Sequence, residues 1–189
     1  MKRGASEEYA LTELQLQALW SQCKEPKEQV LIGLMAYCGL RVSEATHLKL
    51  SWIKNNEIHI PSQMACRCLE WYRRGYWKPK SKAGVRVVAI PGFLEPILLD
   101  YFNKYPDGLH MKRQAVWYRV QTLARKAKLP QIFPHALRAT AATLLASKGF
   151  TAVELCAYFG WARLDVGEHY IRMSSAREGA KRKMKAIWG

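Results

Sequence analysis

Two pairs of charged residues, far apart in the sequence, have the types and spacing needed to bind a phosphate diester. Arg41 and Glu44 are three residues apart, as are His135 and Arg138, and on a helix this spacing puts both members of a pair on one face. A guanidinium group can donate two parallel hydrogen bonds to the non-bridging oxygens of a phosphate diester. Two such groups would also stabilise the additional negative charge of a pentacoordinate phosphorane. The pattern therefore indicates phosphoryl-transfer chemistry.

Each pair has a simpler interpretation when it is considered alone. Arg41 and Glu44 could form a surface ion pair, and His135 and Arg138 could be a solvated helix start, because charged pairs at this spacing are common on helices. The sequence has no phosphate-binding glycine loop, no HExxH motif and no clustered carboxylates for a two-metal nuclease. We therefore expect catalysis without a metal ion or other cofactor.

Five sequence elements follow one another in an order that is informative as a set. They are CGLRVSEA at 38–45, PKSKAGVR at 79–86, PHALRAT at 134–140, FGW at 159–161, and Tyr170, nine residues after Trp161. The set resembles the catalytic domain of the tyrosine recombinase, or phage-type integrase, family, including its archaeal and viral members. The resemblance covers about residues 11–188. It implies a mainly α fold with a small antiparallel β-sheet (α+β), and a site-specific recombinase that cleaves and rejoins DNA.

The resemblance also implies a role for each matching residue. Tyr170 would attack the scissile phosphate and form a 3′-phosphotyrosyl intermediate, which keeps the diester's energy and makes ATP unnecessary. Arg41 and Arg138 would hold the non-bridging oxygens, and Glu44 would orient Arg41 or its neighbours. His135 would assist proton transfer at the tyrosine.

Two positions in this set differ from the common pattern or are ambiguous. Trp161 stands where the family more often has histidine, and its indole N–H can donate a hydrogen bond but cannot shuttle a proton. Lys80 would protonate the departing 5′-oxygen. Lys82 is the alternative, and Lys80 is preferred because its spacing to Arg86 fits the family better.

The charge of the chain indicates a polyanionic partner. Thirty Lys and Arg residues against fifteen Asp and Glu give a net charge of +15, and double-stranded DNA is the expected partner. Candidate DNA contacts are Arg73, Arg74, Lys78, Lys82 and Arg86. By resemblance, a basic tail helix at 176–189 would join protomers into a tetramer on DNA. Two other functions stay open: a type IB topoisomerase, and a DNA-binding relic without activity, against which the complete set of catalytic residues argues.

Capping motifs and periodicity predict the elements that position these residues. Thr12 with Gln15, and Thr151 with Glu154, form capping boxes. Helices are predicted at 13–22, from Pro26 through residue 38, and at 41–48, 94–104, 112–128, 134–148, 152–159 and 176–187, with a short turn around Tyr170. A hairpin at 52–60 and a strand at 85–90 would form the sheet.

Residues 61–79 match neither helical nor strand periodicity and are interpreted as an inserted loop. Cys66 and Cys68 lie in this loop, and His59 is the obvious third ligand if they bind zinc. A C-x-C pair alone is weak evidence for a metal site, so free thiols in a DNA-facing loop are the favoured interpretation.

Length and composition predict one intracellular catalytic domain spanning 1–189. The amino-terminal core-binding domain usual in the family is expected to be absent, and the chain is interpreted either as a fragment of a larger integrase or as a minimal, single-domain member. No apolar stretch approaches the roughly 20 residues of a membrane span, and the first eight residues lack the apolar stretch of an export signal. Five cysteines, an odd number, favour a reducing compartment. The resemblance implies a host cell carrying a virus or other mobile element.

Overall fold

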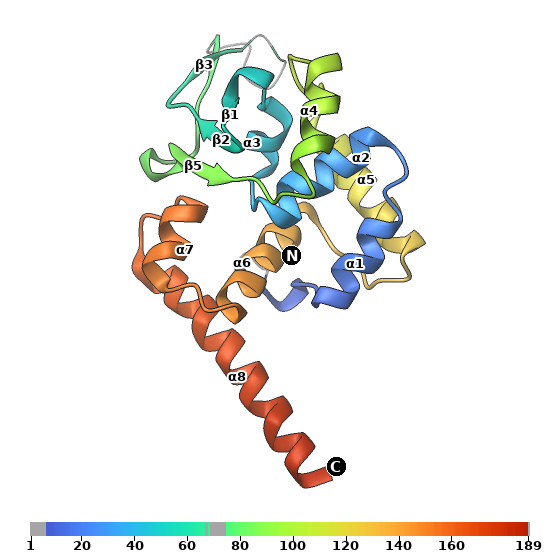
Figure 1. Ribbon diagram of the computed structural model, residues 1–189, viewed down its shortest axis with the longest axis vertical. Coiled ribbons are helices and arrows are strands. Elements are labelled where there is room, and N and C mark those ends of the chain that lie inside the picture. Colours follow the sequence, from blue (N-terminus) through green and yellow to red (C-terminus); the bar gives the residue numbers. More distant parts are fainter. Residues whose placement is uncertain (1–6, 67, 69–74, 189) are drawn as a thin grey trace.

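The protein is mainly helical, with a small antiparallel sheet at one side of the body (Figure 1), which confirms the predicted fold class. The computed structural model describes residues 7–66, 68 and 75–188. The α-helices are α1 (Glu13–Ser21), α2 (Pro26–Ile32), α3 (Val42–His47), α4 (Glu95–Lys104), α5 (Arg113–Lys126), α6 (Pro134–Ser147), α7 (Ala152–Phe159) and α8 (Leu164–Trp188). Single turns of 3₁₀ helix occupy Glu7–Tyr9, Leu50–Trp52 and Lys82–Gly84.

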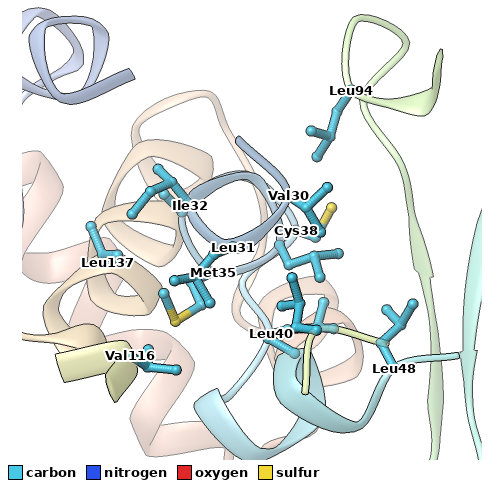
Figure 2. Close-up of a cluster of buried hydrophobic side chains, with 14 of the residues drawn as sticks. Val30, Leu31, Ile32, Met35, Cys38, Leu40, Leu48, Leu94, Val116 and Leu137 are labelled. Atoms are coloured by element: carbon cyan, nitrogen blue, oxygen red, sulfur yellow. The ribbon is translucent and has the colours of Figure 1, made fainter. Parts of the chain in front are cut away.

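Helix α2 and the π-helical turn that continues it, Gly33–Tyr37, form the centre of the hydrophobic core. Every position from Val30 to Ala36 is buried, because other elements surround this segment on all sides. Figure 2 shows its side chains meeting Leu94, Val116 and Leu137, which come from other parts of the chain. The core therefore fixes the start of α3, which follows at once.

The main sheet has the strand order β1, β2, β5, with both pairs antiparallel. The strands are β1 (Ile53–Lys54), β2 (Glu57–Ile60) and β5 (Arg86–Ala89). Asn55 and Asn56, both with positive φ, form the two-residue turn between β1 and β2, which confirms the predicted hairpin. Ile58 lies opposite Val88, and both side chains are buried on the face of the sheet that packs on the helices.

The segment 61–79 contains regular structure that its sequence did not predict. Strands β3 (Met64–Ala65) and β4 (Tyr76–Trp77) pair as a separate two-stranded hairpin. Trp77 is fully buried against Trp52. Each strand has too few residues to show the alternation of apolar and polar residues that predicts a strand. The packing of Trp77 stabilises the hairpin. The interpretation of 61–79 as a loop was therefore wrong for its two ends.

The carboxyl-terminal region is one continuous helix, α8, and not a turn around Tyr170 followed by a separate tail helix. Its first half packs on α6 and α7, and its second half projects away from the body (Figure 1). No helix in the described part of the chain is long and apolar enough to cross a membrane. In α8, charged residues interrupt the apolar ones throughout its 25 residues.

Candidate active site

The residues predicted to carry the chemistry gather around one cleft of about 920 Å³. The cleft lies where the starts of α3, α5 and α6 meet the segment just before β5 and the connection from α7 to α8. Its lining includes five of the predicted residues: Arg41, Lys80, His135, Arg138 and Trp161. Residues from distant parts of the sequence therefore face one volume of a size that accommodates a nucleotide.

Backbone carbonyl groups orient both arginines of the cleft. Arg138 donates from its two terminal nitrogens to the carbonyl oxygens of Gly39 and Phe159, and Arg41 donates to the carbonyl of Gly160 at 3.2 Å. Gly39 and Gly160 have positive φ, and a Cβ at either would lie within 2.5 Å of another atom. Only glycine fits both requirements, so these two turns present the carbonyls that aim the guanidinium groups.

Glu44 is the carboxylate that joins the guanidinium groups into one cluster. Its side chain is 1% exposed and lies 2.9 Å from Arg41, 3.0 Å from Arg86 and 4.0 Å from Arg138. Burial would raise its pKa, but the hydrogen bonds and charge of Arg86, with the charges of Arg41 and Arg138, lower the pKa of Glu44 to about 2. Three guanidinium groups share one carboxylate, so the cluster carries two uncompensated positive charges.

Arg86 belongs to this buried cluster, which disagrees with the DNA contact expected from the sequence. Its side chain is 5% exposed. It donates to both oxygens of Glu44 and to the carbonyls of Tyr158 and Gly84. Its guanidinium donors are therefore committed inside the protein. The physical reason is the pairing of β5 with β2, which points this side chain inward towards α3 and α7.

The cations of the cleft act on His135, which begins α6 beside them. Partial desolvation, followed by the positive charges of Arg138, Arg41, Lys80 and Arg113, lowers the pKa of His135 below 6.5. The imidazole is therefore neutral at physiological pH and has a lone pair for a proton. Burial and Arg41 lower the pKa of Arg138 as well, whereas Glu44 and Tyr170 oppose that shift.

Tyr170 does not itself line the cleft but packs against Trp161, which does. Its ring is parallel to that of Trp161, with centroids 5.1 Å apart and planes inclined by 5°, and Trp161 stacks in turn on Phe159 at 4.8 Å. Tyr170 is 7% exposed. The three rings form a stack that fixes the tyrosine next to Arg138, the guanidinium of which lies 5.8 Å from the Trp161 ring.

Lys80 and Lys82 differ in their relation to the cleft. Both are exposed, but Lys80 lines the cleft together with Ser81, whereas Lys82 is not part of the lining and begins the 3₁₀ turn Lys82–Gly84. Lys78 is also exposed. Arg73 and Arg74 lie outside the described residues. The positions of the two lysines support the preference for Lys80.

Sequence reasoning missed further cationic groups in the cleft. Arg113 and Arg163 both line it. Arg113 follows the N-cap Lys112 at the start of α5, a helix with no acidic residue in its first turn. A helix N-terminus carries partial positive charge and normally attracts acidic residues. Two cations there are a signal in the sequence that could have marked Arg113 as a candidate anion-binding residue.

Comparison with known proteins identifies the family. A model of the phage integrase family matches residues 10–177. The chain belongs to this family. The protein named prophage phiRv2 integrase of Mycobacterium tuberculosis is 28% identical to it over 176 residues, which cover 84% of this chain and 45% of that protein. The chain thus spans less than half the length of this integrase relative.

Solved structures of integrases and recombinases share the fold. The XerA recombinase matches with a TM-score of 0.71 and 20% identity over 92% of this chain and 63% of that chain. The catalytic domain of bacteriophage HP1 integrase matches with a TM-score of 0.62 and 19% identity, covering 92% and 93% of the two chains. The Tn1549 transposon integrase, in complex with transposon right end DNA, matches with a TM-score of 0.67 and 20% identity over 95% of this chain and 66% of that chain. These matches confirm the tyrosine recombinase catalytic-domain fold.

Proposed function

We propose that the chain cleaves and rejoins double-stranded DNA at specific sites, with Tyr170 as the nucleophile. The observation that carries this proposal is the convergence of Arg41, His135 and Arg138 on one cleft, with Tyr170 stacked on a residue of its lining. The cluster around Glu44 has an excess of two positive charges, which favours an anionic ligand in the cleft. Membership of the phage integrase family supports DNA as that ligand.

The two arginines of the cleft hold the scissile phosphate. Arg41 and Arg138 are oriented in advance by Glu44 and by backbone carbonyls, so little reorganisation is needed when the phosphate binds. Positive charge aimed at the phosphorane in a partly dry cleft lowers the energy of the transition state more than it would in water. The indole N–H of Trp161 adds a further donor to a phosphate oxygen.

Proton transfer accompanies each of the two covalent steps. The phenol oxygen of Tyr170 attacks phosphorus, its proton passes to neutral His135, and the bond from phosphorus to the 5′-oxygen breaks. Lys80 gives its proton to that leaving oxygen. In the reverse direction a 5′-hydroxyl attacks the phosphotyrosine and restores the tyrosine. The number of phosphodiester-type bonds is constant, so the cycle needs neither ATP nor a cofactor.

A suicide substrate tests this proposal. The substrates are nicked duplexes that together cover the DNA on both sides of the gene. Cleavage next to the nick releases a short fragment, and its loss prevents religation and traps the covalent intermediate. Wild type should form an adduct that survives denaturation, without added divalent cations or ATP, and Tyr170→Phe should form none. Tyr118→Phe is the control, since Tyr118 is 57% exposed on α5. An adduct in Tyr170→Phe would refute the role of Tyr170.

Plasmids with one or two sites distinguish a recombinase from a topoisomerase of type IB. A recombinase rearranges the two-site plasmid, whereas a topoisomerase relaxes supercoils in both plasmids and rearranges neither. Wild type that relaxes both and recombines neither would exclude the proposed recombinase. Wild type that does neither and forms no adduct would leave only a DNA-binding relic.

We also propose that α8 joins protomers into a tetramer on DNA. The second half of α8 projects from the body (Figure 1), and Met184, Ile187 and Trp188 are 57%, 66% and 80% exposed near its end. Apolar side chains in such a position indicate a surface that a partner covers. Recombination between two sites cleaves four DNA strands. One tyrosine is needed for each strand, so we propose four protomers.

A further inference from the structure

Three potential metal ligands lie together at the carboxyl end of α3. They are the Nε2 atom of His47 and the sulfur atoms of Cys66 and Cys68, which all lie within 4.8 Å of one another. The Cys66 and Cys68 sulfurs are 3.1 Å apart, and the Cys68 sulfur is 3.4 Å from Nε2. His59, the third ligand that the sequence suggested, instead contacts Glu57, so the ligand nearest to both thiols is His47.

The backbone fixes the tautomer of His47 that can bind a metal. Nδ1 lies 2.7 Å from the carbonyl oxygen of Ser43, and a carbonyl only accepts, so Nδ1 carries the proton. Nε2 therefore presents its lone pair to the two thiols. The ring also packs at 5.7 Å and 20° on the buried Trp77. A hydrogen bond from the second ring nitrogen to a backbone carbonyl is the usual support of a metal-binding histidine.

The distances among the three atoms can be compared with those of a tetrahedral zinc site. Bond lengths of about 2.3 Å to sulfur and 2.0 Å to nitrogen place two sulfurs about 3.8 Å apart, and sulfur and nitrogen about 3.5 Å apart. The Cys68 sulfur, 3.4 Å from Nε2, is within about 0.1 Å of the distance in such a site. The two sulfurs, 3.1 Å apart, must separate by about 0.7 Å, and the Cys66 sulfur lies within 4.8 Å of Nε2. Cys68 is exposed at the surface, so its side chain has room to adjust.

We propose that His47, Cys66 and Cys68 bind one Zn²⁺ ion, with a water molecule at the fourth position. Two thiolates and an imidazole match the ligand preference of zinc, and each thiol releases its proton to the solvent when it binds.

Such an ion would fasten the β3–β4 hairpin to α3. Cys66 follows β3, and His47 ends α3, three residues after Glu44. The ion would therefore connect the helix that carries the centre of the arginine cluster to the segment that leads on to Lys80. Its role is structural, and the inference does not depend on the proposed DNA cleavage.

Metal content and cobalt spectroscopy test the site directly. The full chain is purified without a histidine tag or chelator, together with Cys68→Ser and the control Cys156→Ser, in which the substituted cysteine is only partly buried. Wild type and the control should contain about one zinc per chain and Cys68→Ser almost none. Cobalt(II) added to the metal-free proteins should give thiolate charge-transfer bands and tetrahedral ligand-field bands in the first two only.

Thermal unfolding provides a second measurement that does not depend on purification history. Zinc added after chelation should raise the melting temperature of wild type and of Cys156→Ser. It should leave that of Cys68→Ser unchanged, because the loss of a ligand weakens binding by more than roughly 100-fold. His47→Gln should behave like Cys68→Ser. Equal and substoichiometric zinc in wild type and Cys68→Ser would overturn the proposal.

Discussion

The arginine cluster predicts a large and pH-dependent loss of stability when Glu44 is replaced by glutamine. The substitution keeps the shape of the side chain and removes its charge, which leaves Arg86 and Arg138 buried without a counter-ion. Lowering the pKa of Glu44 from 4.5 to about 2 corresponds to about 3 kcal/mol of folding free energy at neutral pH. In other proteins, removing one partner of a buried ion pair lowers the free energy of unfolding by about 3 to 5 kcal/mol. We expect a loss in this range at pH 7.

The sign of the pH dependence follows from the direction of the shift. Because the pKa of Glu44 is lower in the folded state, its contribution is complete above pH 4.5 and is lost as pH falls towards 2. At pH 3 about 1 kcal/mol of the stabilisation should be left. Wild type should therefore lose stability over this window, whereas Glu44→Gln has no carboxyl group there to protonate. The difference between the two proteins should shrink accordingly.

Urea unfolding at pH 7, 5 and 3 measures this difference. The control is Glu13→Gln, which removes a carboxylate whose side chain is 60% exposed and lies 3.5 Å from the ammonium group of Lys148. Exposed pairs contribute at most about 1 kcal/mol, so the control should stay close to wild type at every pH. If Glu44→Gln loses less than about 1 kcal/mol at pH 7, or its deficit is constant with pH, the account of the cluster is refuted.

Three further predictions concern the rest of the site and α8. Trp161→Ala removes the stack on Tyr170 and should lower the free energy of unfolding by about 3 kcal/mol. Trp161→Phe keeps an aromatic ring there, so its loss of stability should be clearly smaller. Equal losses for the two variants in urea unfolding would show that the stack does not stabilise the fold. His135 should titrate below pH 6.5 in NMR spectra of the free protein, and Lys80→Met should raise its midpoint because one nearby cation is removed; an unchanged midpoint would contradict this. Trp188→Ala should leave the melting temperature and single-site DNA binding unchanged, but it should weaken tetramer assembly on two-site DNA by roughly tenfold. Equal assembly of the variant and wild type in native gels would show that this residue is not in the interface.

The parts of the fold that sequence could predict are those set by local interactions. The capping boxes of Thr12 with Gln15 and of Thr151 with Glu154 start α1 and α7 as predicted. The turn at 55–56 joins two strands as predicted. The β3–β4 hairpin has only two residues in each strand, too few for a strand period, and depends on distant packing. The continuity of α8 likewise depends on its contacts with α6 and α7.

The candidate site divides in the same way. Arg41 with Glu44, and His135 with Arg138, could be recognised because each pair lies within one helical turn. The position of Arg86 beside Glu44 depends on the register of β5 against β2, which no local pattern specifies. The proximity of His47 to Cys66 and Cys68 depends on the same kind of long-range packing. Sequence therefore identified all of these groups except His47 as candidates, but their mutual positions depend on tertiary structure.

The departures from ordinary stabilising patterns in this chain converge on the cleft. Helix α5 begins with two cations where the helix dipole favours anions. Helix α6 begins at Pro134, and its N-cap residue Phe133 provides no side-chain cap; the first residues of this helix line the cleft. The buried cluster has three guanidinium groups for one carboxylate. Negative charge in the cleft would offset each of these departures. They therefore agree with our proposal that the cleft binds one phosphate diester of DNA.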